Sequence, residues 1–138
     1  MKTVKNALRL KAHHVTGTTR DIEAVISWYV TNLDLQVAEQ GELLNGAMKY
    51  VVLALPGYSI SFVQFAKPAP EPERPATGVS TWVHPVFSVP DPDALYRQLE
   101  AKGVRLATHG PKPSVLKSFL LYDCEGRELE IVADGAVH

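Results

Sequence analysis

Two histidines, His14 and His84, lie about 70 positions apart and begin segments of similar pattern. Each is followed by a short strand-like run and, seven residues on, by an aspartate, Asp21 or Asp91. A single histidine in a strand is usually a packed or surface residue. If the two halves are related by a pseudo-twofold axis, however, equivalent positions face each other across a shared cleft. Two imidazoles meeting there would suit a divalent metal.

A carboxylate that could complete such a site lies on the last strand-like run of the chain. Glu130 stands between Leu129 and Ile131, and it points away from this apolar pair because successive strand residues alternate between faces. A glutamate in this position is either solvated or functional. Glu128 shares its face but lies closer to a turn, so we expect Glu128 to be exposed.

A helix follows each of the two histidine-containing runs. In the second half, Asp91 is predicted to be an N-cap with Pro92 at the first helical position, and Gly103 to end the helix. The apolar face of this second helix is formed by Leu95, Tyr96 and Leu99. In the first half, apolar residues recur at helical spacing; they are Ile22, Val25, Ile26, Tyr29, Val30 and Leu33.

Two strand pairs close the two halves at equivalent places. Residues 48–65 are predicted to form two strands joined at Gly57, and residues 117–133 two strands joined at Gly126. A weaker strand is expected after each helix, near residues 36–39 and 104–108. Each half is therefore β-α-β-β-β, and the pattern predicts an α+β protein with a sheet backed by helices.

The composition is that of one globular domain. The chain has 138 residues, of which 46% are hydrophobic and 21% charged. A net charge of -1 argues against nucleic-acid binding, and no apolar run approaches the ~20 residues of a membrane span. The single cysteine, Cys124, excludes an intramolecular disulfide and a cysteine-cluster metal site, and the simplest location is the cytoplasm. Residues 67–78 contain four prolines and are predicted to link module one (about 10–66) to module two (about 79–134).

These features together resemble the vicinal oxygen chelate superfamily, which includes glyoxalase I, type I extradiol dioxygenases, fosfomycin-resistance enzymes and bleomycin-resistance proteins. The resemblance covers the chain from about Ala12 to Ala133. It rests on HVTGTTRDIEAVISWY, on HPVFSVPDPDALYRQLEAKGV and on the closing pattern of Asp123, Gly126 and Glu130. It implies two tandem βαβββ modules that form a cupped mixed sheet around a metal and substrate cleft.

By resemblance, the metal ligands fall on His14, His84 and Glu130, with His13 as the alternative to His14 if the register slips by one residue. The fourth ligand of glyoxalase I, a glutamate, would fall on Ser61, which lies 69 positions before Glu130 and cannot supply a carboxylate. The implied set is therefore two imidazoles and one carboxylate, with coordination positions left open.

An open set of this kind is typical of non-haem Fe(II) oxygenases, so Fe(II) is favoured, with Mn, Zn or Ni as alternatives. We expect dioxygenase-type chemistry on a small substrate that chelates the metal through two adjacent oxygens, the metal acting as a Lewis acid. One alternative is a glyoxalase-like lyase or isomerase that uses Zn or Ni. Another is a drug- or metabolite-sequestering protein of the bleomycin-resistance type.

The resemblance also suggests catalytic roles for Tyr122 and His109 beside Glu130, with His109 in a loop that covers the pocket in relatives. Four residues are expected to contact substrate, although each also fits simple packing: Thr16, Ser61, Trp82 and Tyr122. Short relatives commonly form homodimers, some with ligands from both chains, so we expect a homodimer with a small-molecule substrate and neither nucleic-acid nor membrane partners.

Overall fold

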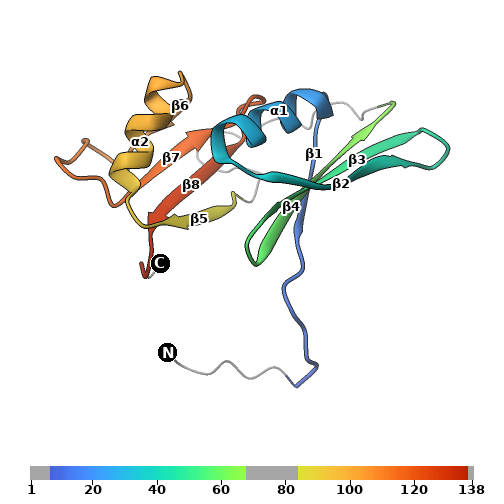
Figure 1. The fold of residues 1–138 in the computed structure, drawn as a ribbon, viewed down its shortest axis with the longest axis horizontal. Coiled ribbons are helices and arrows are strands. Elements are labelled where there is room, and N and C mark those ends of the chain that lie inside the picture. Colours follow the sequence, from blue (N-terminus) through green and yellow to red (C-terminus); the bar gives the residue numbers. More distant parts are fainter. Residues whose placement is uncertain (1–6, 68–83, 137–138) are drawn as a thin grey trace, which may run out of the picture.

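The computed structural model describes residues 7–67 and 84–136. Module one forms one four-stranded mixed sheet in the order β1-β4-β3-β2 (Figure 1). Its elements are β1 (Val15–Thr18), α1 (Ile22–Leu33), β2 (Gln36–Leu43), β3 (Met48–Leu55) and β4 (Tyr58–Phe65). The predicted linker at 67–78 lies almost wholly outside the described residues.

Module two repeats this topology with a second four-stranded sheet in the order β5-β8-β7-β6. Its elements are β5 (Val86–Val89), α2 (Pro92–Ala101), β6 (Arg105–Ala107), β7 (Ser118–Tyr122) and β8 (Glu128–Ala133). In both modules the first strand pairs in parallel with the last, and the other pairings are antiparallel. The predicted α+β fold of two βαβββ modules is confirmed.

Strand register shows that the two halves are equivalent residue by residue around the candidate site. Thr16 of β1 pairs with Ser61 of β4, and Val86 of β5 pairs with Glu130 of β8. Thr16 and Val86 are related by the same offset of 70 as His14 and His84. Ser61 therefore stands in module one where Glu130 stands in module two.

Both helices begin at the predicted caps. The side chain of Asp21 accepts a hydrogen bond from the backbone N–H of Ala24, and that of Asp91 accepts one from Ala94, each at 3.1 Å. The apolar stripe of α1 is narrower than predicted, because Val30 is 39% exposed. At 100° per residue, Val30 lies at the rim of the stripe that Ile22, Val25 and Tyr29 bury.

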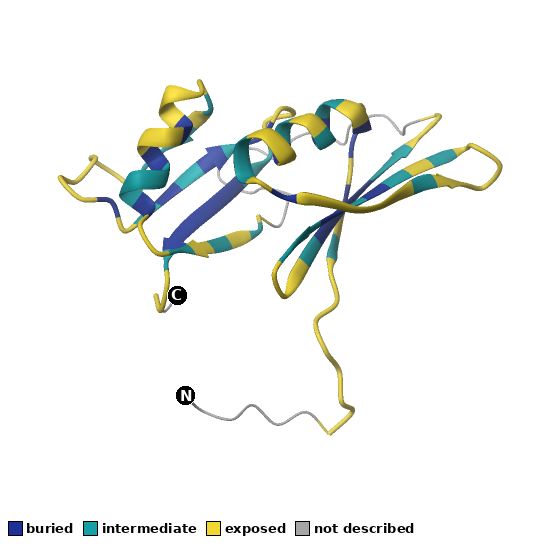
Figure 2. Ribbon diagram, viewed as in Figure 1, coloured by how far each residue is buried: buried dark blue, intermediate teal, exposed yellow. Residues whose placement is uncertain are grey.

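Each helix packs against one face of its own sheet. Among the residues that the structure describes, no helix of the same module packs on the other face, which we call the open face, although β8 is buried along most of its length (Figure 2). In β8, Leu129 and Ile131 are buried in the core, so Glu128 and Glu130 belong to the face turned away from α2. This alternation places the predicted carboxylate on the open face. No helix in the described ranges is both long and apolar enough to cross a membrane.

The turn between β7 and β8, residues 123–127, joins the two modules. The buried hydroxyl of Tyr29 in α1 donates a hydrogen bond to Asp123 Oδ2 at 2.8 Å. Glu125 Oε1 accepts hydrogen bonds from Thr19 Oγ1 at 2.7 Å and from the backbone N–H of Asp21 at 3.3 Å. These bonds fix the start of β8, and with it Glu130, relative to the first helix.

Candidate metal centre

The open face of module two brings Glu130 against two imidazoles. Glu130 Oε2 lies 3.3 Å from His84 Nε2, and Glu130 Oε1 lies 3.2 Å from His109 Nε2. The side chain of Glu130 is only 7% exposed. A carboxylate removed from water to this degree needs charged or hydrogen-bonding partners, and here both of its oxygens face imidazole nitrogens.

The strand pairing explains why His84 and Glu130 meet. The backbone N–H of Glu130 donates a hydrogen bond to the carbonyl of Pro85 at 3.0 Å, which ties the residue after His84 to β8. His109 comes from the other side, on the loop that follows β6. The expected catalytic residues Glu130 and His109 are thus in contact, and a loop residue covers part of the open face.

Glu128 is not exposed as predicted but half-buried, and it contacts the second nitrogen of His84. Its Oε2 lies 3.4 Å from His84 Nδ1, and its Oε1 accepts a hydrogen bond from the Tyr122 hydroxyl at 3.3 Å. Proximity to the turn does not expose it, because His84 and Tyr122 lie on either side of it. The sequence contained a signal for this contact, because Glu128 lies on the same strand face as Glu130, at the neighbouring position on that face.

Tyr122 is held as a hydrogen-bond donor. Burial first, and then the charge of Glu128 and the hydrogen bond to it, raise the pKa of Tyr122 above its usual value of 10.0. The guanidinium of Arg105 lies 4.3 Å from the centroid of the tyrosine ring and opposes this shift. At neutral pH the phenol therefore stays protonated, and its proton is directed at Glu128.

The third predicted metal ligand, His14, lies immediately before β1 in module one and is exposed. Its Nδ1 is 2.6 Å from Nδ1 of the neighbouring His13. Within residues 7–67 and 84–136 of a single chain, no three His, Cys, Asp or Glu residues are grouped so that they could hold a metal ion. The structure thus brings together His84 and Glu130, and the triad that includes His14 stays a prediction.

The predicted substrate-binding residues fall in both modules. Thr16 and Ser61 are neighbours on paired strands, and their hydroxyl oxygens are 2.6 Å apart. Tyr122 lies in module two beside Glu128. Trp82 lies outside the described residues.

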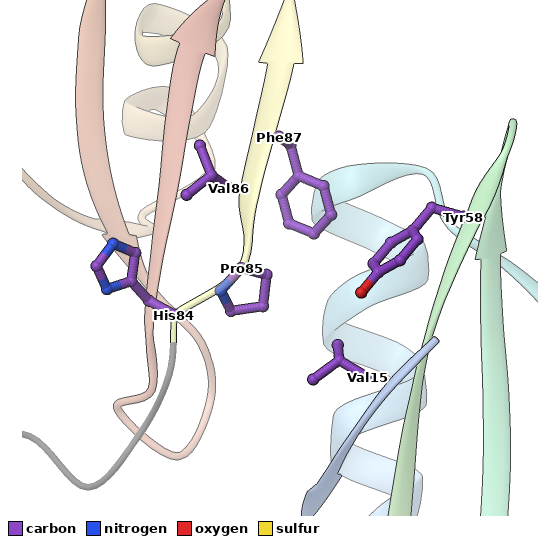
Figure 3. A pocket seen from close by; sticks show the side chains of 6 residues that line it. All are labelled: Val15, Tyr58, His84, Pro85, Val86 and Phe87. Atoms are coloured by element: carbon purple, nitrogen blue, oxygen red, sulfur yellow. The ribbon is translucent and has the colours of Figure 1, made fainter. Parts of the chain in front are cut away.

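A cavity of about 250 Å³ opens between β1 and the start of β5 (Figure 3). Its lining consists of Val15, Tyr58, His84, Pro85, Val86 and Phe87. Figure 3 shows the ring of His84 pointing away from Val15 and Tyr58, toward the second sheet. His84 thus separates this mostly apolar cavity from the carboxylates of β8. Sequence reasoning missed Tyr58, which directly follows the β3–β4 turn.

The donor types present fit a divalent metal in part. An imidazole Nε2 and a carboxylate oxygen, such as those of His84 and Glu130, are common ligands of Zn, Fe, Mn and Ni. Glu130 lies on β8 and His84 just before β5, with 3.3 Å between the two donor atoms, and Ser61 adds no carboxylate at the equivalent place in module one. A complete set needs at least one more ligand beyond this pair.

Solved structures of similar fold come from several organisms. A glyoxalase I from Leishmania major, described as trypanothione-dependent, superposes with a TM-score of 0.72 at 14% identity, covering 91% of this chain and 87% of that one. A glyoxylase/bleomycin resistance protein/dioxygenase domain from Frankia sp. EAN1pec gives 0.67 at 23% identity, covering 92% and 95%. The fosfomycin resistance protein FosX from Listeria monocytogenes, in complex with Mn(II) and sulfate, gives 0.66 at 15% identity, covering 92% and 93%.

No curated protein matches the chain at a significant level. A family model does match, over residues 11–131, which is most of the chain. This match agrees with the topology and with the equivalence of the two modules. The chain belongs to the Glyoxalase/Bleomycin resistance protein/Dioxygenase superfamily.

Proposed function

We propose that this protein is a metal-dependent vicinal oxygen chelate enzyme with Fe(II) dioxygenase-type chemistry on a small substrate. The observation that carries the proposal is the 3.3 Å approach of His84 Nε2 to the almost buried Oε2 of Glu130. Ser61 at the place equivalent to Glu130 favours an open ligand set over one with a fourth carboxylate. Open positions are needed where a metal is to bind both substrate and O2.

In this proposal His84, Glu130 and His14 hold the metal. When bound, the metal supplies Lewis acidity that stabilises negative charge on two adjacent substrate oxygens. His109, whose Nε2 contacts Glu130 Oε1, stands where it can exchange a proton with a substrate beside the carboxylate. Tyr122 has its hydroxyl engaged by Glu128, so we assign it a supporting role rather than that of an acid.

We further propose that His14 reaches the site in a homodimer, from a second copy of the chain. Apolar side chains are exposed on the strand faces that the helices leave open: Leu43 is 49% exposed, Phe65 42% and Val86 45%. Laying module one of one copy over module two of the other would cover such side chains and would bring His14 toward His84. Each dimer would then hold two equivalent sites.

Elemental analysis of protein purified without chelator, beside the Glu130→Ala variant, tests the proposal. We expect close to one iron or manganese per chain, lost in the variant, and O2 consumption with catechol-like substrates. Bound zinc or nickel with no O2 consumption would redirect the assignment to a glyoxalase-like lyase. If no metal is present and none is taken up on reconstitution, a ligand-sequestering protein becomes the better account.

A further inference from the structure

Glu128 occupies the side of the His84 ring that the metal would not use. Its Oε2 lies 3.4 Å from Nδ1, while Nε2 of the same ring lies 3.3 Å from Glu130. The imidazole is thus held between two carboxylates of one strand, β8. We infer that Glu128 is a positioning residue for His84. The Glu128 carboxylate accepts a hydrogen bond from His84 Nδ1 and thereby directs His84 Nε2 to the metal beside Glu130.

The chemistry of imidazole gives this contact its consequence. A neutral imidazole carries one proton, so a ring that ligates a metal through Nε2 must carry its proton on Nδ1. A carboxylate placed at Nδ1 favours that tautomer, fixes the ring orientation and makes Nε2 a stronger donor. The structure provides Glu128 at this place for His84.

Glu128 is itself held by a cross-strand pair. It stands directly opposite Tyr122 in the β7–β8 register, and the tyrosine hydroxyl donates to its Oε1. The other oxygen, Oε2, is the one that faces His84. The guanidinium of Arg105, on the neighbouring strand β6, lies over the other side of this pair, 4.3 Å from the centroid of the Tyr122 ring. The carboxylate therefore has one oxygen for its support and one for the imidazole.

The arrangement belongs to module two alone. The offset of 69 that relates Glu130 to Ser61 relates Glu128 to Ser59, which pairs with Ala54. Neither residue can act as a carboxylate or as a phenol. Because the two modules share their topology, the fold does not require the Glu128–Tyr122 pair, and a role specific to His84 accounts for it.

The inference rests on the proposed metal centre, and metal affinity tests it without reference to any substrate. Zn²⁺ affinity is measured by competition with a chromophoric chelator, and the visible absorption of the Co²⁺-loaded protein reports ligand geometry. We expect Glu128→Ala to weaken Zn²⁺ binding by about 10–100-fold and to change the Co²⁺ bands. Glu128→Gln keeps an oxygen acceptor and should recover part of the loss, and Tyr122→Phe should cause a smaller loss.

The matched control is Glu100→Ala, which removes an exposed carboxylate from α2 of the same module and should leave both readouts unchanged. Wild-type affinity and an unaltered Co²⁺ spectrum in Glu128→Ala would overturn the inference and leave the metal centre standing. A loss that Glu128→Gln does not relieve at all, with a matching drop in folding stability, would show a purely structural role and overturn it too. A wild-type protein that binds neither ion removes the metal centre and the inference together.

Discussion

At the scale of single residues, the buried hydroxyl of Tyr29 stabilises the contact between the modules. It donates to Asp123 Oδ2, which also binds the Arg127 guanidinium at 2.9 Å. We expect Tyr29→Phe to lower the free energy of unfolding by about 1.5–3 kcal/mol, the range for a hydrogen bond to a charged group. Urea denaturation measures this loss. Tyr50→Phe, which breaks an exposed bond to Glu39, is the control and should cost much less.

The same hydroxyl predicts a dependence of stability on alkaline pH. Burial first, and then the charge of Asp123 and the hydrogen bond to it, raise the pKa of Tyr29 far above 10.0 in the folded protein. An unfolded chain ionises this group near pH 10, so its stabilising contribution is complete below about pH 10 and is lost as pH rises further. Unfolding free energies measured from about pH 8 to 11 should fall more steeply for the wild type than for Tyr29→Phe. Parallel curves would contradict this account.

Cys124 should be a slow nucleophile although its residue is exposed. Burial of the thiol first, and then the charges of Asp123 and Glu125, raise its pKa above the usual 9.0. Because the thiolate is the reactive form, alkylation by iodoacetamide near pH 7.5 should be slower in the folded protein than in urea. Faster reaction in the folded state would show that Arg127 dominates the local field.

Single residues also mark the limit of what the sequence predicts at the site. The alternation of β8 placed Glu130 on the open face, and the offset between the halves placed Ser61 at its equivalent. The same pattern puts Glu128 on the face of Glu130, but it could not place His84 against Glu128 or His109 against Glu130. Those contacts depend on the path of a loop and on which neighbouring side chain fills the space, and neither follows from strand periodicity.

At the scale of elements, the β7–β8 turn acts as an additional cap for α1. Glu125 Oε1 accepts from the backbone N–H of Arg20 at 2.9 Å as well as from Thr19 and Asp21. We expect Glu125→Ala to lower the free energy of unfolding by about 1–2 kcal/mol, as the loss of a helix cap does. Glu125→Gln, which keeps an acceptor, should cost less. Thermal denaturation followed by circular dichroism measures both, and equal stability of the alanine variant and the wild type would count against the cap.

Elements were the part of the fold that the sequence predicted best, because their signals are local. An N-cap aspartate, a proline at the first helical position and turn glycines act over four or five residues, and all of them appear as expected. The strand β2 is longer than predicted, since it ends at Leu43 and not at residue 39. Pairing with β3 extends β2, and the local sequence pattern of a strand does not reveal which strand it pairs with.

At the scale of the whole molecule, a mixing experiment locates the origin of His14. If each site takes His14 from one chain and Glu130 from the other, a heterodimer of His14→Ala and Glu130→Ala chains keeps one intact site. Unfolding and refolding the two variants together should then restore about a quarter of the wild-type metal content per chain. Each variant refolded alone is the control. Recovery of nothing would indicate that every site is built within one chain.

The relative placement of modules is also where sequence reasoning ends. Two βαβββ units could be recognised from their repeat, and the family from their order. Whether His14 meets His84 depends on how the sheets of the two modules pack against each other. This packing produces no periodic pattern in a single sequence. The contacts that decide it within the chain, such as Tyr29 with Asp123, join residues 94 positions apart.

The parallel pairing of first and last strands has a consequence for how the chain folds. β1 cannot find its partner until β4 has been made, and the pair Thr16–Ser61 closes a loop of 45 residues. Long-range pairings of this kind form slowly, because the chain loses conformational entropy on closing the loop before the stabilising contacts form. Since each module closes on itself, the first can complete its sheet while the second is still being synthesised. The tandem arrangement thus divides one slow search into two shorter ones, taken in order from the N-terminus.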